Sequence, residues 1–130
     1  GCGSSVCWPA ESMADDSESR VRRYYAALNA LDLGAVESMF AIDASYHSAG
    51  ISALRGRAAI MAAMRVYFDE YPDQVAVFDT LESQGQNTIR TTWRLKATSR
   101  TTGQVHERRG NETIIFGGDG QIERIEVEDL

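Results

Sequence analysis

The sequence predicts an α+β domain in which three N-terminal helices pack on a strongly curved antiparallel sheet. Two observations lead to this expectation. Before Pro72, apolar residues recur at intervals of three and four residues in three segments, which is the spacing of one helix face. After Gln74, apolar and polar residues alternate from one segment to the next, which is typical of half-buried strands. Helices followed by strands in this order favour an α+β architecture.

The domain is expected to occupy residues 15–130. Residues 1–14 show neither the helical nor the strand spacing of apolar residues and are rich in Gly, Ser and Cys. We therefore expect them to be a disordered leader or a non-native remnant. The first helix is expected to start near Ser17. Its apolar face follows the helical spacing through Val21, Tyr24, Tyr25, Leu28 and Leu31.

Two further helices are expected before the strands begin. Asp32 is the predicted N-cap of a short helix that ends near Phe40. The third helix is predicted from about Arg57 to Tyr71, where a Pro-Asp pair stops it. The segment 41–54 between these two helices is expected to be irregular or briefly extended.

Four strands are predicted in the second half, at residues 75–82, 88–98, 105–116 and 122–129. The last two are joined by Gly117-Gly118-Asp119-Gly120, a turn rich in Gly and Asp that is typical of a β-hairpin. No repeat and no long linker divides the chain, so all the elements are expected to form one domain.

Composition excludes several classes of protein. The net charge of −6 and the pI near 4.8 disfavour a nucleic-acid partner, which would need a basic face. No apolar run reaches the about 18 residues that span a bilayer, so we expect a cytoplasmic protein without membrane contact. The two cysteines, Cys2 and Cys7, match no zinc signature, so no metal is expected.

Ionisable residues continue an apolar strand face near the C-terminus. Side chains two residues apart share one face of a strand, so Arg108 and Glu112 lie on the same side as Ile114. The hairpin register places the face of Val127 and Asp129 beside them. Arg108, Glu112 and Asp129 are therefore expected to project toward one concavity and form a binding or catalytic pocket. The alternative is a solvent-exposed end of the sheet with ordinary ion pairs.

Short motifs follow one another in a characteristic order from Arg20 to the C-terminus. They are Tyr24-Tyr25-Ala26-Ala27-Leu28, Asp32-Leu33, Tyr46-His47, Leu54-Arg55-Gly56, Tyr71-Pro72-Asp73, Trp93, Arg109-Gly110, and Gly118-Asp119-Gly120-Gln121-Ile122 leading to Asp129. Their order and spacing resemble the nuclear transport factor 2-like superfamily, and in particular its SnoaL-like branch.

This resemblance implies a cone formed by the curved sheet and the three helices, with an internal cavity. It also implies small-molecule chemistry of the kind found in polyketide cyclases, ketosteroid isomerase and limonene epoxide hydrolase, generally without a metal or organic cofactor. An apolar cavity can raise the pKa of a carboxylic acid into the range useful for acid/base catalysis. The strand around Trp93 carries no acid, so it departs from the epoxide hydrolase pattern. The ketosteroid isomerase arrangement, a tyrosine on the first helix with an acid on a strand, could be echoed by Tyr24 or Tyr25, for which core packing is the alternative.

We expect the catalytic residues among four ionisable side chains: Glu112, Asp129, His47 and Arg108. Glu112 or Asp129 would move the proton, while Arg108 and His47 orient groups or stabilise charge. Aromatic side chains are expected to line the cavity and bind substrate: Tyr46, Tyr67, Phe68 and Trp93. Each also has a structural alternative, such as an ion pair for Glu112.

The expected function is cofactor-free acid/base chemistry on a largely apolar small molecule: isomerisation, aldol-type cyclisation, dehydration or hydrolysis. A homodimer is expected through the outer face of the sheet. The alternative is a non-catalytic ligand-binding or dimerisation module of the same fold.

Overall fold

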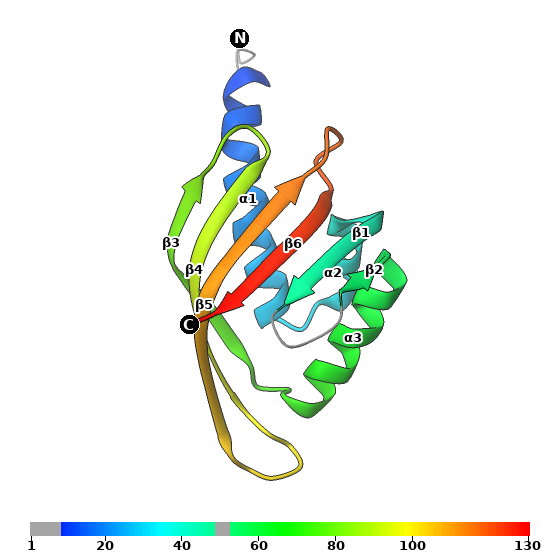
Figure 1. Cartoon of the computed structure of the whole chain (residues 1–130), viewed down its shortest axis with the longest axis vertical. Coiled ribbons are helices and arrows are strands. Elements are labelled where there is room, and N and C mark those ends of the chain that lie inside the picture. Colours follow the sequence, from blue (N-terminus) through cyan, green and yellow to red (C-terminus); the bar gives the residue numbers. More distant parts are fainter. Residues whose placement is uncertain (1–8, 49–52) are drawn as a thin grey trace.

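The computed structural model describes residues 9–48 and 53–130, with side chains from Ser17 onward outside that gap. Its helices are α1 (Pro9–Asn29), α2 (Leu33–Met39) and α3 (Arg57–Glu70). Its strands are β1 (Phe40–Ser48), β2 (Leu54–Arg55), β3 (Val75–Ser83), β4 (Thr88–Thr98), β5 (Val105–Phe116) and β6 (Ile122–Asp129). Figure 1 shows α1 lying across one face of the sheet, with α3 beside β1 and β2.

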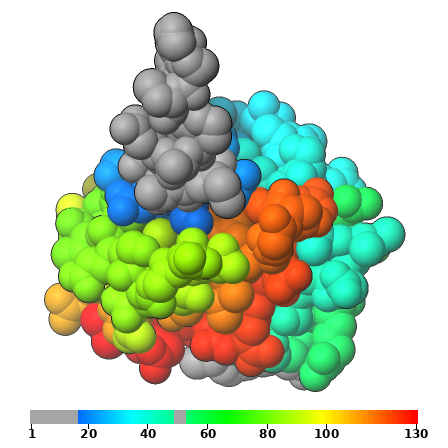
Figure 2. Space-filling model, turned by 90° about the horizontal axis from the view of Figure 1, so that it is seen from above, coloured from blue at the N-terminus to red at the C-terminus, as the bar shows by residue number. Residues whose placement is uncertain are grey.

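The strands form one mixed sheet in the order β2-β1-β6-β5-β4-β3. Neighbouring strands run antiparallel except β1 and β6, which are parallel. α1 packs against β3 and β4, and α3 packs against β1 and β2. Seen from above in Figure 2, the turn between β5 and β6 lies between the β3–β4 hairpin and the α2–β1 region. The sheet curls around the core like a cone without closing into a barrel.

Most of the expected elements are confirmed. β4, β5 and β6 have the predicted bounds, and α2 begins after Asp32, whose Oδ1 accepts a hydrogen bond from the Ala35 N–H at 3.2 Å. The register of β5 and β6 pairs Ile114 with Ile125 and Glu112 with Val127, as the hairpin predicts. The two apolar faces therefore lie on one side of the sheet.

The expectation for 41–54 is wrong in part, because a nine-residue strand, β1, begins directly after α2. Buried and exposed residues do not alternate along its first half: Ala41 and Ala44 are buried, whereas Ile42 and Asp43 are exposed. The register of β1 against β6 shifts in this stretch, so the period of two that marks a strand is missing from the sequence. Because β1 is parallel to β6, the sheet is mixed rather than wholly antiparallel.

The first helix begins earlier than expected, at Pro9 instead of near Ser17. Proline suits the first helical position, and the residues that follow include the strong helix formers Ala10, Glu11 and Met13. Residues 9–14, expected to belong to a leader, are therefore helical. The remainder of that expectation, residues 1–8, lies outside the described residues.

The helices and the sheet bury one apolar core. Its fully buried side chains come from α1, the α2–β1 junction, α3 and the central strands, and include Val21, Tyr24, Phe40, Ile60, Met61, Ile89, Ile114 and Ile125. Full burial of one such apolar side chain contributes about 1.5–3 kcal/mol to the free energy of folding. The ring of Tyr24 packs edge-on against Phe40, with centroids 5.9 Å apart, and so fastens α1 to the start of β1.

A glycine in β5 makes room for a tryptophan in β4. Gly110 pairs with Trp93 across the two strands. A Cβ atom at Gly110 would collide with the backbone carbonyl of Glu128 on β6 and would approach Cζ2 of Trp93 to 2.7 Å. The missing side chain therefore leaves the space that the Trp93 indole occupies.

The variant Gly110→Ala is expected to lower the free energy of unfolding by roughly 2 kcal/mol, because the added methyl group overpacks against a backbone that cannot move easily. The urea midpoint would measure this loss. Gly118→Ala is the matched control, because a Cβ there meets nothing within 4 Å. Equal midpoints for the two variants would contradict the proposed role of Gly110.

Candidate functional site

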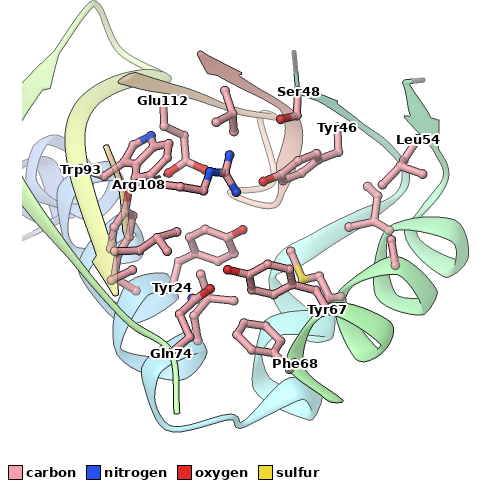
Figure 3. A pocket seen from close by; sticks show the side chains of 18 residues that line it. Tyr24, Tyr46, Ser48, Leu54, Tyr67, Phe68, Gln74, Trp93, Arg108 and Glu112 are labelled. Carbon is pink, nitrogen blue, oxygen red and sulfur yellow. Dashed lines mark hydrogen bonds between the residues drawn. The ribbon is translucent and has the colours of Figure 1, made fainter. Parts of the chain in front are cut away.

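A pocket of about 320 Å³ lies between the inner face of the sheet and the helices α1 and α3. Figure 3 shows the eighteen side chains that line it among the described residues. They come from all six strands or their flanks and from both helices. Residues far apart in the sequence therefore meet at one place, which is open to solvent on one side.

Aromatic and aliphatic side chains make up most of the lining. The aromatic ones are Tyr24, Tyr25, Tyr46, Tyr67, Phe68 and Trp93. The remaining polar side chains are Ser48, Gln74, Arg108 and Glu112. Such a surface offers a small molecule a large apolar contact area and a few polar groups that can fix its orientation.

Glu112 places a carboxyl group in the pocket wall. It lies in the middle of β5, is paired with Thr91 on β4, and is only 7% exposed. The Tyr25 hydroxyl donates a hydrogen bond to Glu112 Oε1 at 2.7 Å and lies 3.1 Å from the Thr91 hydroxyl. Within the described residues we find no hydrogen bond to Oε2, so this oxygen is available to a ligand.

The environment of Glu112 raises the pKa of its carboxyl group to about 7. Burial is the cause, because the charged form loses its hydration; the hydrogen bond from Tyr25 opposes the shift only in part. The carboxyl group therefore exchanges its proton near neutral pH. This is the property that a general acid or base needs.

The tyrosines of the lining keep their protons. Burial, followed by the nearby Glu112 charge, raises the pKa of Tyr24, Tyr25 and Tyr46. Burial also raises the pKa of Tyr67, and the Arg108 charge counters this only in part. Their hydroxyl groups therefore remain available as hydrogen-bond donors.

Arg108 forms the charged side of the pocket and is held by Asp129. Its Nη2 lies 2.6 Å from Asp129 Oδ1 and its Nε 3.1 Å from Oδ2, so the pair is bidentate. The guanidinium carbon lies 5.5 Å from the centroid of the Trp93 ring, a cation–π contact. Figure 3 shows the guanidinium group pointing into the pocket between Glu112 and Tyr46.

Six of the eight candidate residues meet at this pocket. Glu112 and Arg108 line it, as do the four expected aromatic residues Tyr46, Tyr67, Phe68 and Trp93. This arrangement fits the expected concavity, while the roles of the residues stay predictions.

Two candidates are not part of the described lining. Asp129 contacts the site only through Arg108. His47 follows Tyr46 on β1, so its side chain points to the opposite face of the sheet, where its Nε2 is buried without a hydrogen-bond partner among the described residues. Neither side chain therefore shares the pocket with Glu112.

Two residues of the site are not indicated by any local pattern of the sequence. Tyr25 belongs to the predicted apolar face of the first helix, but nothing local to it indicates a bond to Glu112, eighty-seven positions away. Gln74 stands between the stop of α3 and the start of β3, where a polar residue is ordinary. In the structure Gln74 is 6% exposed and lines the pocket.

The side chains described here include no group of three or more His, Cys, Asp or Glu residues that could hold a metal ion. No described helix is long and apolar enough to cross a membrane.

Solved structures with a similar fold include several proteins of small-molecule metabolism. An epoxide hydrolase/cyclase-like enzyme, SalBIII, with a role in pyran ring formation in the polyether salinomycin, superposes with a TM-score of 0.79 at 16% identity, over 88% of this chain and 90% of its own. A putative polyketide cyclase from Xanthomonas campestris pv. campestris superposes with a TM-score of 0.76 at 19% identity, over 90% of this chain and 92% of its own. The protein RV0760c from Mycobacterium tuberculosis, in complex with estradiol-17beta-hemisuccinate, superposes with a TM-score of 0.78 at 16% identity, over 86% of this chain and 92% of its own. At these identities the likeness shows a shared fold.

No match to a curated protein sequence is found. A family model, described as a SnoaL-like domain, matches residues 21–125, which include every described lining residue of the pocket except Val127. With the curled sheet, the three helices and the fold shared with polyketide cyclases and epoxide hydrolase-like enzymes, this match shows that the chain belongs to the SnoaL-like domain family.

Proposed function

We propose that this protein binds a largely apolar small molecule in its pocket and catalyses cofactor-independent proton transfer on it, with Glu112 as the acid and base. The observation that carries this proposal is a buried carboxyl group, titrating near neutral pH, in the wall of a pocket lined mostly by apolar groups. Isomerisation, aldol-type cyclisation, dehydration and hydrolysis all need such a group.

Glu112 Oε2 is the oxygen that exchanges the proton. Tyr25 occupies Oε1 and fixes the plane of the carboxyl group, so the second oxygen is directed toward the bound molecule. With a pKa of about 7, both protonation states are populated at neutral pH. The same group can therefore take a proton from one carbon or oxygen of the ligand and return it to another.

Arg108 and the tyrosine hydroxyl groups stabilise the negative charge that develops on a ligand oxygen. Asp129 accepts hydrogen bonds from two nitrogens of the guanidinium group, so Arg108 is in position before the ligand arrives. Tyr46 presents a protonated hydroxyl near it. Preorganised donors of this kind lower the barrier because they need no rearrangement during the reaction. In this scheme Asp129 is a positioning residue.

Similar structures support a small-molecule ligand. One is bound to a steroid ester, and others are cyclase-like or epoxide hydrolase-like enzymes. The pocket volume of about 320 Å³ lies at the lower end of the range of about 300–1,000 Å³ that is usual for ligand sites. A homodimer through the outer face of the sheet also stays a proposal; the exposed Val75, Val77 and Val105 on that face support it.

Replacing Glu112 by Gln is expected to abolish proton transfer while leaving the fold intact. The apolar ketone 2-tetralone in D₂O is a suitable probe, because deuterium uptake at its α-carbons reports enolisation by NMR. We expect a loss of at least about 100-fold in the exchange rate, the usual contribution of a general base.

Glu107→Gln is the matched control, since Glu107 lies on the same strand with its side chain exposed on the opposite face. Equal exchange rates for Glu112→Gln and wild type would sink the catalytic assignment. Binding of 2-tetralone by wild type without any exchange would favour a non-catalytic binding module instead.

Glu112 should also make the protein less stable as pH rises. Its pKa is raised from 4.5 to about 7 on folding, so the folded state retains a proton that the unfolded state releases between these values. The contribution of Glu112 to the free energy of unfolding is therefore fully present below pH 4.5. It is lost as pH rises from there through 7, by about 3 kcal/mol. Urea unfolding of wild type and Glu112→Gln between pH 5 and 8 measures it. The difference in the free energy of unfolding between the two proteins should change as pH rises toward 7. A constant difference would contradict the pKa assigned to Glu112.

The variant Tyr25→Phe should extend this dependence to higher pH. The Tyr25 hydroxyl stabilises the carboxylate, so its loss raises the pKa of Glu112 further. The same unfolding series should show stability that continues to fall above pH 7, where the wild-type curve levels off. Tyr71→Phe serves as the control, because Tyr71 contacts Tyr67 and His106 rather than Glu112. A fall that levels off at the same pH in Tyr25→Phe and in wild type would contradict the role of the hydrogen bond.

A further inference from the structure

A second polar group faces the pocket away from Glu112. The Gln74 side chain lines the pocket and is 6% exposed, yet no hydrogen bond to its amide group is found among the described residues. Figure 3 shows Gln74 on the opposite side of the pocket from Glu112 and Arg108, with the hydroxyl groups of Tyr24 and Tyr67 between them. The Tyr67 hydroxyl is likewise buried without a partner in the described part of the chain.

The backbone on both sides of Gln74 is fixed. The Gln74 N–H donates to the Tyr71 carbonyl at 3.2 Å, and Asp73 Oδ1 accepts from the Thr98 N–H at 2.7 Å. Two residues further on, Ala76 exchanges two hydrogen bonds of 2.8 Å with the Asn29 side chain at the end of α1. The amide group of Gln74 is therefore directed into the pocket by a rigid support, although it has no structural partner there among the described residues.

The register of the sheet separates this amide group from the acid. Glu112 pairs with Thr91 on β4, whereas Ala76, two residues after Gln74, pairs with Leu95. Thr91 and Leu95 are four residues apart, which is roughly 13 Å of extended strand, and Gln74 lies beyond Leu95. One polar group of a ligand therefore cannot serve both ends of the pocket.

We infer that Gln74, together with the Tyr67 hydroxyl of the same lining, forms a distal subsite that recognises a hydroxyl or carbonyl oxygen at the far end of the ligand. An amide group offers both donor and acceptor, so it matches a hydroxyl group best. The substrate class is then an elongated, largely apolar molecule with oxygen groups at both ends, one beside Glu112 and one beside Gln74. This inference rests on the ligand-binding part of the proposed function.

The apolar residues between the two subsites fit the same ligand class. Leu28, Ala76, Trp93 and Leu95 are apolar lining residues, and Arg108, which pairs with Leu95, is the one charged side chain of the described lining besides Glu112. The Gln74 amide group has no hydrogen-bond partner among the described residues, so a ligand oxygen that bonds to it adds affinity. The subsite therefore adds specificity for length as well as for polarity.

Two pairs of ketones test the subsite at two lengths: 2-tetralone with 6-hydroxy-2-tetralone, and 4-phenylcyclohexanone with 4-(4-hydroxyphenyl)cyclohexanone. Isothermal titration gives the Kd of each for wild type, Gln74→Met and the exposed control Gln84→Met. In at least one pair we expect the hydroxyl group to tighten binding to wild type and to Gln84→Met by about tenfold. Gln74→Met should lose this gain while binding the parent ketone as wild type does.

Thermal unfolding without ligand provides the second measurement. Gln74→Met should be at least as stable as wild type, because it removes an amide group for which the described residues supply no partner. A hydroxyl group that adds no affinity in either pair, or a gain that persists in Gln74→Met, would overturn the subsite while leaving proton transfer by Glu112 intact. Failure of all four ketones to bind wild type would instead overturn the proposed function, and the subsite with it.

Discussion

The burial of one carboxyl group is the constraint on which the site depends. Glu112 lies in the middle of a central strand, where a charged group costs free energy unless it is neutralised or hydrogen-bonded. Tyr25 supplies one hydrogen bond, and the remaining penalty is what raises the pKa of the carboxyl group toward neutrality. The burial that raises the pKa of Glu112, and is proposed to make it useful for catalysis, therefore also lowers the stability of the fold.

The fold holds this group by bringing three elements to one point. α1 presents Tyr25 because its apolar stripe packs on β3 and β4, and β4 presents Thr91 in register with Glu112. The Tyr25 ring also packs edge-on against Phe78, with centroids 5.2 Å apart, so the helix cannot rotate without breaking that contact. The hydrogen bond to the acid therefore depends on core packing as much as on the residues that form it.

The side of the pocket near the C-terminus is built from a chain of contacts across the sheet. Gly110 leaves space for the Trp93 indole, Trp93 supports the Arg108 guanidinium group, and Asp129 holds that group from the end of β6. Each contact joins neighbouring strands, so the orientation of Arg108 depends on the register of β4, β5 and β6. A substitution at Gly110 is therefore expected to disturb the site as well as the fold.

Much of the fold could be predicted from the sequence because its local patterns agree with its tertiary structure. The alternation in β4 to β6 and the hairpin turn define the face that carries Glu112, and this pattern alone predicts an acid among apolar residues. β1 could not be predicted, since its register shift removes the period of two. Gln74 could not be predicted either, and the bond from Tyr25 was suggested only by the resemblance to ketosteroid isomerase, which left Tyr24 as the alternative. Both depend on contacts between segments far apart in the chain, which no local pattern records.

The most direct test of the account is the pKa of Glu112 in the folded protein. Carbon-13 NMR of the side-chain carboxyl carbon, assigned by comparison with Glu112→Gln, gives this value in a pH titration. The account predicts a midpoint near 7, because burial outweighs the hydrogen bond from Tyr25. A midpoint near the ordinary value of 4.5 would show that the carboxylate is well solvated, and would contradict both the buried acid and its proposed part in proton transfer.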